Sequence, residues 1–320
     1  MIPDRPRLTI APKHLALLFL PMLVVTASEA ILSAFANTKL SLDGIDLAQS
    51  DIPELVGRYR FLAVFFFYVS SCVTVLAIFC ADIYARHSRT SLARIAVGFV
   101  LLIAFSALFS MLEPEWMGSF EAYELVGARL FTEGLQAGQM GYCLAGFCGE
   151  AGAFHALRLL NEITNLASAL AVSAVVLGMI VALARPGPIV LDTRDGLLEE
   201  AATLMAAQKQ VRRYLYLAGL LLSVGMMLGY AWMHWPSGLI ADPGVAQGYN
   251  DLVEAISLYR GVSYSVLILS FYMPVSLIQM VRIERLHAAA AVQGMPDVSE
   301  AVQGFDIERI GSLDALKAIV

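Results

Sequence analysis

The sequence predicts an all-α, polytopic integral membrane protein with six transmembrane helices. Of its 320 residues, 58% are apolar and only 15% are charged, against about 45–50% and about 25% in a soluble domain. The apolar residues also gather into six runs, each near the roughly 20 residues of helix that cross a hydrocarbon core about 30 Å thick. The runs lack the two-residue alternation of barrel strands, so helices are expected.

The six runs define the expected spans in chain order. They are Leu15–Ala36, Phe61–Ala81, Ile95–Leu112, Ile163–Ala184, Tyr214–Met233 and Gly261–Val281. The basic N-terminus followed by the first run also resembles a cleaved signal peptide. We favour a retained span because the apolar stretch continues for a full membrane crossing after a proline-rich start.

The distribution of Lys and Arg predicts that both chain termini lie in the cytoplasm. Positively charged loops are retained on the cytoplasmic side of a membrane. With the N-terminus inside, 15 of the 21 Lys and Arg residues are cytoplasmic, and the outer loops hold 6 together with 14 acidic residues. This N-in, C-in orientation fits a bacterial inner membrane.

The spans and loops together give the expected organisation of the chain. It comprises a cytoplasmic N-terminus 1–14, a transmembrane domain 15–285 with outer loops 37–60, 113–162 and 234–260, a cytoplasmic helical extension 195–213, and a cytoplasmic tail 286–320. The extension before the fifth span and the residues after the sixth are expected to pack as a helical hairpin. Leu198, Ala202 and Met205 recur at the spacing that such packing needs.

Glu29 is the one acidic residue well inside a span, about 6 Å from the middle of its run. A carboxylate at this depth costs a few kcal/mol unless it is protonated or paired. One interpretation is a proton or cation site. The other is a structural ion pair, with Arg60 or Arg260 as the partner from an outer loop.

The second outer loop contains two features of interest. Cys143 and Cys148 lie on the predicted periplasmic side, where an oxidising compartment favours a disulfide. The surrounding segment Gly134–Gly149 has no charge and is rich in glycine. We expect a surface loop, with a re-entrant loop lining a cavity as the alternative.

Small residues at four-residue spacing predict close helix packing in two spans. Gly225 and Gly229 form such a motif in the fifth span, and Ala174 and Gly178 form a similar strip in the fourth. These contacts are expected within the subunit, with a subunit interface as the alternative. A third pattern, of aromatic residues ending the fifth span, predicts an interfacial belt that includes Trp235.

The sequence offers no recognisable catalytic, nucleotide or metal motif. The net charge of −6 and the lack of a basic stripe argue against nucleic-acid binding. We therefore expect no cofactor and no enzymatic activity. The expected partners are membrane lipids and either further copies of the chain or other membrane subunits.

Three functional classes remain open on the sequence alone. The first is a non-enzymatic membrane subunit that acts through helix packing and soluble-face contacts, in a homo-oligomer or a larger complex. The second is an ion channel or pore, less favourably a transporter, with Glu29 or Gly134–Gly149 lining the path. The third is a membrane enzyme. We favour the non-enzymatic subunit because it requires only packing motifs and helical extensions, and the sequence contains both.

Overall fold

The computed structural model describes residues 8–35, 46, 52–116, 149–187 and 191–294, and every regular element within them is a helix. The helices are α1 (Pro12–Leu15), η1 (Ala16–Leu18), α2 (Phe19–Phe35), α3 (Ile52–Arg86), α4 (Arg89–Trp116), α6 (Gly149–Val181), α7 (Arg194–His234), η3 (Trp235–Leu239) and α8 (Pro243–Val292). Six helical segments are long and apolar enough to cross a membrane. The predicted helical, multi-pass class is confirmed at that level.

Helices α7 and α8 are much longer than a bilayer requires. They contain 41 and 50 residues, which correspond to about 60 Å and about 75 Å of helix at about 1.5 Å per residue. The hydrocarbon core of a bilayer is only about 30 Å thick. Both helices therefore continue well past the apolar runs that they contain.

Each of the three predicted outer loops, 37–60, 113–162 and 234–260, is helical over part of its length. Helix α3 begins nine residues before Phe61, at Ile52, and α6 begins at Gly149. Helix α8 begins at Pro243, where the Asp242 carboxylate caps it by accepting hydrogen bonds from the backbone N–H groups of Gly244 and Val245. Hydropathy marks only the lipid-facing length, whereas the helix starts at its cap.

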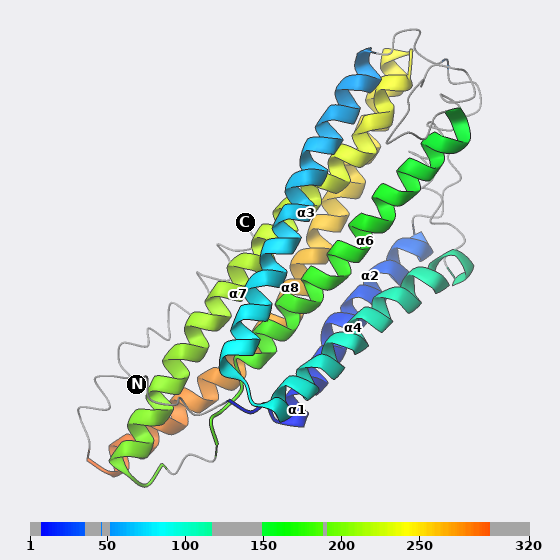
Figure 1. Ribbon diagram of the computed structural model, residues 1–320. Helices are drawn as coiled ribbons and strands as arrows, with labels where there is room; N and C mark the ends of the chain where they lie inside the picture. The colour runs from blue at the N-terminus through cyan, green and yellow to red at the C-terminus, as the bar shows by residue number, and fades with distance from the viewer. Residues whose placement is uncertain (1–7, 36–45, 47–51, 117–148, 188–190, 295–320) are drawn as a thin grey trace.

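Four helices form a bundle, with the other two on its flank (Figure 1). Helices α3, α6, α7 and α8 pack against one another, α2 packs on α8, and α4 packs on α6. Helix α6 and the turn that follows it lie in the centre, because every residue from 173 to 184 is buried. A helix that is apolar on all sides is expected in such a central position.

The N-terminal segment ties several chain segments together at one end of the bundle. The Leu8 N–H donates to the Arg86 carbonyl, and the Thr9 N–H donates to the Arg185 carbonyl at 2.7 Å. The Arg94 guanidinium donates to the Ile10 carbonyl at 2.6 Å. We call this end, defined by residues 8–10, 86–88 and 185, the basic end. The end that carries Trp235 is the opposite end.

Beyond the basic end, α7 and α8 continue together as a helical hairpin, formed by residues 194–213 and 282–292 (Figure 1). The hairpin has a small hydrophobic core of its own, separate from that of the bundle. Its buried members are Leu197, Ala201, Leu204, Ile283, Leu286 and Ala290. The expectation that these two extensions pack together agrees with this arrangement.

The expected packing face of the hairpin was wrong by one residue. Leu198, Ala202 and Met205 are exposed, and the preceding positions Leu197, Ala201 and Leu204 are buried instead. The reason is that α7 is one continuous helix with one buried stripe. That stripe continues through Val211, Leu215, Ala218, Leu221 and Val224 into the bundle at the three-to-four spacing of a coiled-coil seam.

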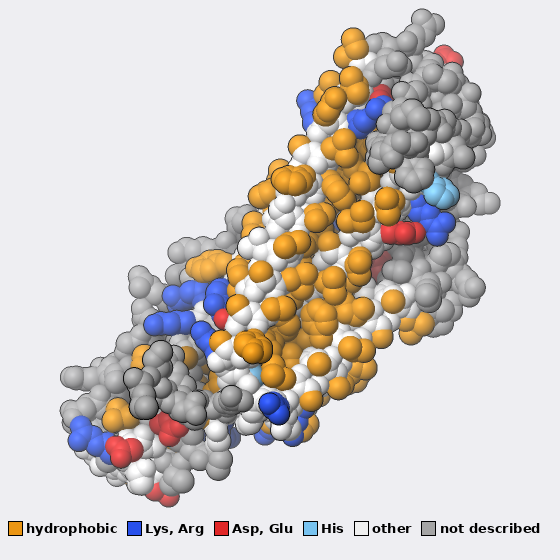
Figure 2. All heavy atoms as spheres, in the orientation of Figure 1, with side chains coloured by type: hydrophobic (Ala, Val, Ile, Leu, Met, Phe, Trp, Pro, Cys, Tyr) orange, Lys and Arg blue, Asp and Glu red, His pale blue; other side chains and the backbone are white. Residues whose placement is uncertain are grey.

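The surface fits a protein embedded in a bilayer. Figure 2 shows hydrophobic side chains covering much of the middle of the visible face, with Lys and Arg gathered toward the ends. Large apolar side chains such as Phe66, Val100 and Leu166 are exposed along the bundle. Exposed apolar residues in such number are typical of a surface that contacts lipid or another protein.

Candidate functional site

The charged side chains that lie between helices are the most distinctive chemical feature of the bundle. Charges are almost never buried unless they are paired. Among the residues that the structure describes, four acidic side chains are buried, and each of them contacts at least one arginine: Glu29, Glu54, Asp82 and Glu200. These four acid–arginine clusters are therefore the candidate functional sites of the bundle.

Glu29 lies on α2 and pairs with Arg260 of α8. The Arg260 guanidinium donates to Glu29 Oε1, and both side chains are buried. Hydroxyl groups extend the contact along both helices, because Ser28 donates to Ser263 at 2.9 Å and the Tyr259 hydroxyl donates to the Ser28 carbonyl at 2.6 Å. The whole cluster joins α2 to the bundle.

Arg60, the other arginine considered from the sequence, is exposed on α3. Glu29 Oε2 is buried and has no hydrogen-bond partner among the described residues. One carboxylate oxygen of the pair is thus committed to Arg260, and the second remains available to a donor. The arrangement is that of a buried ion pair with a flanking hydroxyl network.

Asp82 connects α3 to α7. Its Oδ2 atom accepts from the Arg213 guanidinium and, at 3.1 Å, from the Tyr214 hydroxyl. The Tyr214 ring lies directly against Gly178 of α6, where an added Cβ would be 2.1 Å from ring atom Cε1. Gln210 donates to the Gly178 carbonyl at 2.9 Å. Gly178 is therefore required by the approach of α7 to α6.

The other three residues of the small-residue motifs also lie along helix contacts. Ala174 is fully buried in α6. Gly225 faces Tyr68 of α3, where an added Cβ would make an ordinary contact at 3.4 Å. Gly229 is half-buried one turn further along α7. Of the motif glycines whose contacts are described, Gly178 has the tightest one.

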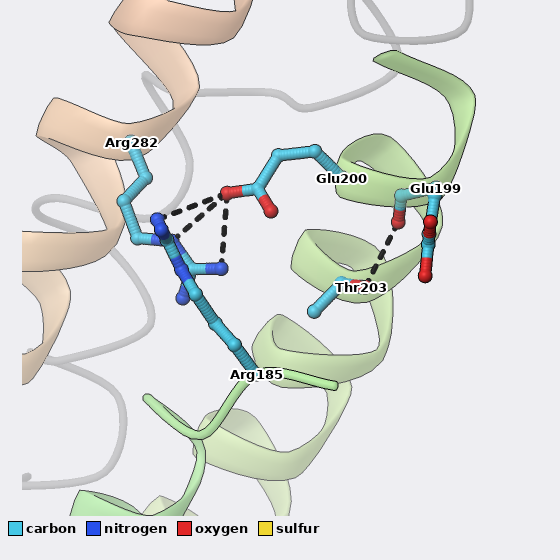
Figure 3. A network of polar contacts seen from close by, with 5 residues as sticks. All are labelled: Arg185, Glu199, Glu200, Thr203 and Arg282. Atoms are coloured by element: carbon cyan, nitrogen blue, oxygen red, sulfur yellow. Dashed lines mark hydrogen bonds and ion pairs between the residues drawn. The ribbon is translucent and has the colours of Figure 1, made fainter. Parts of the chain in front are cut away.

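Glu200 joins three chain segments at the basic end (Figure 3). Its Oε1 atom accepts from Arg282 Nε at 3.1 Å, from Arg282 Nη2 at 3.0 Å and from Arg185 Nη2 at 3.2 Å. Glu200 lies on α7, Arg282 on α8, and Arg185 in the segment after α6. This cluster locks the base of the hairpin to the bundle.

A fourth cluster closes the opposite end. Glu54 of α3 accepts from the Trp235 indole at 2.7 Å and from Arg58 at 2.6 Å and 3.0 Å. Trp235 is fully buried, so its expected place in an interfacial aromatic belt was wrong. The indole fits because Gly57 lies against it, with an added Cβ there 2.9 Å from the ring.

The remaining sequence-derived site residues lie outside the described part of the chain. Cys143, Cys148 and residues 134–148 of the glycine-rich segment are among them, and Gly149 is the first residue of α6. Within the described residues, Cys72 and Cys80 are free cysteines and no disulfide is present. No described group of three His, Cys, Asp or Glu side chains could hold a metal ion.

Sequence reasoning missed three of the four acidic clusters, although a signal for one of them was present. Asp82 directly follows the run Phe61–Ala81, and Arg213 directly precedes the run Tyr214–Met233. The predicted topology places both residues on the same side of the membrane, each at the end of a span. Glu200 and Arg282 carried no such signal, because their contact depends on the rotation of α7 in the hairpin.

Comparison with known proteins identifies no relative. No family model matches the chain, and neither curated proteins nor solved structures give a match.

Proposed function

We propose that this protein is a non-enzymatic integral membrane subunit. Its bundle holds the helical hairpin at one membrane surface, and the hairpin makes the contacts that place the chain in a homo-oligomer or a larger complex. Following the charge distribution, we place the basic end and the hairpin in the cytoplasm and assign the protein to a bacterial inner membrane.

The observation that carries the proposal is the continuity of the hairpin with the bundle. Helices α7 and α8 pass from one to the other without a break, since α7 runs from Arg194 to His234 and α8 from Pro243 to Val292. At the junction, the Glu200 carboxylate binds arginines from two further segments. A rigid element of this kind suits a role in positioning a partner.

Two features of the bundle support a subunit over a self-sufficient pore. The half of α6 that approaches the basic end is buried on all sides, so helix packing fills the centre of the bundle. Glu29, the residue that a cation path would use, is bound to Arg260. A paired carboxylate loses most of its attraction for a passing cation because the guanidinium offsets its charge.

Native mass spectrometry of the gently extracted protein, comparing two matched double variants, tests the proposal. Leu198→Lys with Met205→Lys alters the outward face of the hairpin, where these side chains are 43% and 42% exposed. Leu55→Lys with Val245→Lys makes the same change at the opposite end, where exposure is 40% and 42%. We expect a stoichiometric assembly for the wild type and the control, and its dissociation in the hairpin variant.

Ion flux in liposomes separates this proposal from the pore. The subunit proposal predicts no ion flux above that of empty liposomes for the wild type or for Glu29→Gln. A conductance that Glu29→Gln changes would instead establish the pore. A monomeric chain with the same mass in both double variants would contradict the role in assembly.

A further inference from the structure

Three residues at the basic end each lie directly outside an apolar run. His14 precedes the run Leu15–Ala36, Arg185 follows the run that ends at Ala184, and Arg282 follows the run that ends at Val281. Residues at the ends of spans lie at the level of the lipid headgroups. These three therefore share one depth, which is the depth of the phospholipid phosphates.

The fold gathers these residues from three separate segments. Both arginine guanidinium groups bind the same oxygen, Glu200 Oε1 (Figure 3). His14 is on α1, and the segment just before α1 is paired with Arg185 through Thr9. The cluster is held in place by the backbone, since Thr9 and Arg185 exchange two backbone hydrogen bonds, of 2.7 Å and 3.0 Å.

The cluster carries more positive charge than its acid can offset. Two guanidinium groups face one carboxylate, and Lys13 adds a further cation beside His14. The Arg282 side chain is 7% exposed, yet its Nη1 atom has no hydrogen-bond partner among the described residues. A buried charged donor without an acceptor is energetically unfavourable. The site is therefore incomplete without an anion.

The hydrogen-bonding capacity of the cluster indicates the kind of anion. His14 Nδ1 and Glu200 Oε2 are also buried without a partner among the described residues. A phosphate oxygen accepts from a guanidinium with good geometry. A headgroup hydroxyl donates to a carboxylate oxygen such as Glu200 Oε2. An anionic phospholipid whose headgroup carries hydroxyl groups supplies both.

We propose that His14, Arg185 and Arg282 bind the phosphate of an anionic glycerophospholipid with a hydroxyl-bearing headgroup. The Arg185 side chain is 44% exposed and forms the entrance from the membrane surface. Glu200 orients the two guanidinium groups and accepts from the headgroup. The lipid links α1, α7 and α8 at the base of the hairpin, so its binding stiffens the junction.

Native mass spectrometry of the full-length protein, stripped of lipid in detergent, tests this site. The protein is titrated with phosphatidylglycerol and with phosphatidylcholine of the same acyl chains. Arg282→Gln risks unfolding, so the test variant is Arg185→Gln, and Arg89→Gln is its control. Arg89 is an exposed arginine at the same end of the bundle, and it takes no part in the contacts described for the cluster.

We expect the wild type and Arg89→Gln to retain phosphatidylglycerol in preference to phosphatidylcholine. Arg185→Gln weakens phosphatidylglycerol binding by about tenfold, as expected for loss of one charge-assisted hydrogen bond. Inorganic phosphate does not displace the lipid. Equal retention of the two lipids, or an equal loss in both variants, overturns the proposal. Displacement of the lipid by inorganic phosphate would show that the site binds the free anion, and it would overturn the proposal of a lipid ligand.

Discussion

Arg260 of α8 donates to Glu29 of α2, and this buried ion pair is a charged contact that holds α2 to the bundle. Helix α2 lies on the flank and packs mainly on α8. The Ser28 hydroxyl of α2 and the Tyr259 and Ser263 hydroxyls extend the contact over about one turn of α8. The pair therefore fixes both the position and the register of α2.

Removing one partner of this pair is expected to destabilise the fold. Glu29→Gln removes the charge that faces the buried Arg260 guanidinium, and removing one partner of a buried ion pair costs about 3–5 kcal/mol. Replacing both partners, with Glu29→Gln and Arg260→Met, removes that penalty and restores much of the stability. Thermal unfolding in detergent measures the cycle. Arg60→Gln, at an exposed position on α3, serves as the control and leaves the midpoint unchanged. Additive losses in the double variant would refute the coupling.

Gly178 and Gly225 form a matched test of the small-residue motifs. Gly178→Ala places a Cβ 2.1 Å from the Tyr214 ring, which cannot retreat because it is buried and bonded to Asp82. We expect a loss of about 1–3 kcal/mol from overpacking. Gly225→Ala meets Tyr68 at 3.4 Å and is neutral or slightly stabilising. Unfolding midpoints in one detergent compare the two, and equal effects would contradict the assigned contact.

Adjacent residues in the hairpin test its register. Leu204 is fully buried in the hairpin core, whereas Met205 is exposed. Leu204→Ala is expected to destabilise the protein by about 2–5 kcal/mol, and Met205→Ala by less than about 0.5 kcal/mol. Limited proteolysis at the hairpin and thermal unfolding both report the difference. The reverse order would mean that the originally expected face, with Leu198 and Met205 inside, is the true one.

Protonation of His87 is expected to destabilise the folded protein in mild acid. It lies buried between α3 and α4 and bridges to Leu8. Burial lowers its pKa from 6.5 and the Arg86 charge lowers it further, against the opposing influence of the Leu8 backbone and Asp82. The unfolded state then binds the proton more readily than the folded state. Stability is full above about pH 6.5 and falls as the pH drops toward the lowered pKa.

Unfolding midpoints recorded between about pH 8 and pH 5 measure this dependence. His87→Gln is expected to flatten the acid side of the profile. His155→Gln, which changes an exposed histidine of α6, keeps the wild-type slope. An unchanged slope in His87→Gln would show that another group controls the acid response.

The coarse architecture was predictable from the sequence because hydrophobic runs of membrane length have few other solutions. The ends of the helices were not, since a cap such as Asp242 lies far outside the run that it serves. The face of the hairpin was missed for a related reason. Leu197 and Leu198 are both apolar, and only the seam running through Val211 into the bundle decides which of them is buried.

Among the buried acids, the sequence indicated some and not others. Glu29 was identifiable because a lone acid within an apolar run is conspicuous. Glu54 and Glu200 lie outside the apolar runs, and nothing in their sequence context distinguishes them from exposed acids such as Glu199. Their burial is a consequence of how α3 meets η3 and how α7 meets α8, which is tertiary information.

Site-specific photo-crosslinking in the native membrane tests the proposed role of the hairpin most directly. A photoreactive residue is placed at Leu198 or Met205 on the outward face of the hairpin, and at Leu55 or Val245 at the opposite end. The account predicts discrete crosslinked protein bands from the two hairpin positions and none from the two control positions. Bands from the control positions alone, or none from either hairpin position, would contradict it.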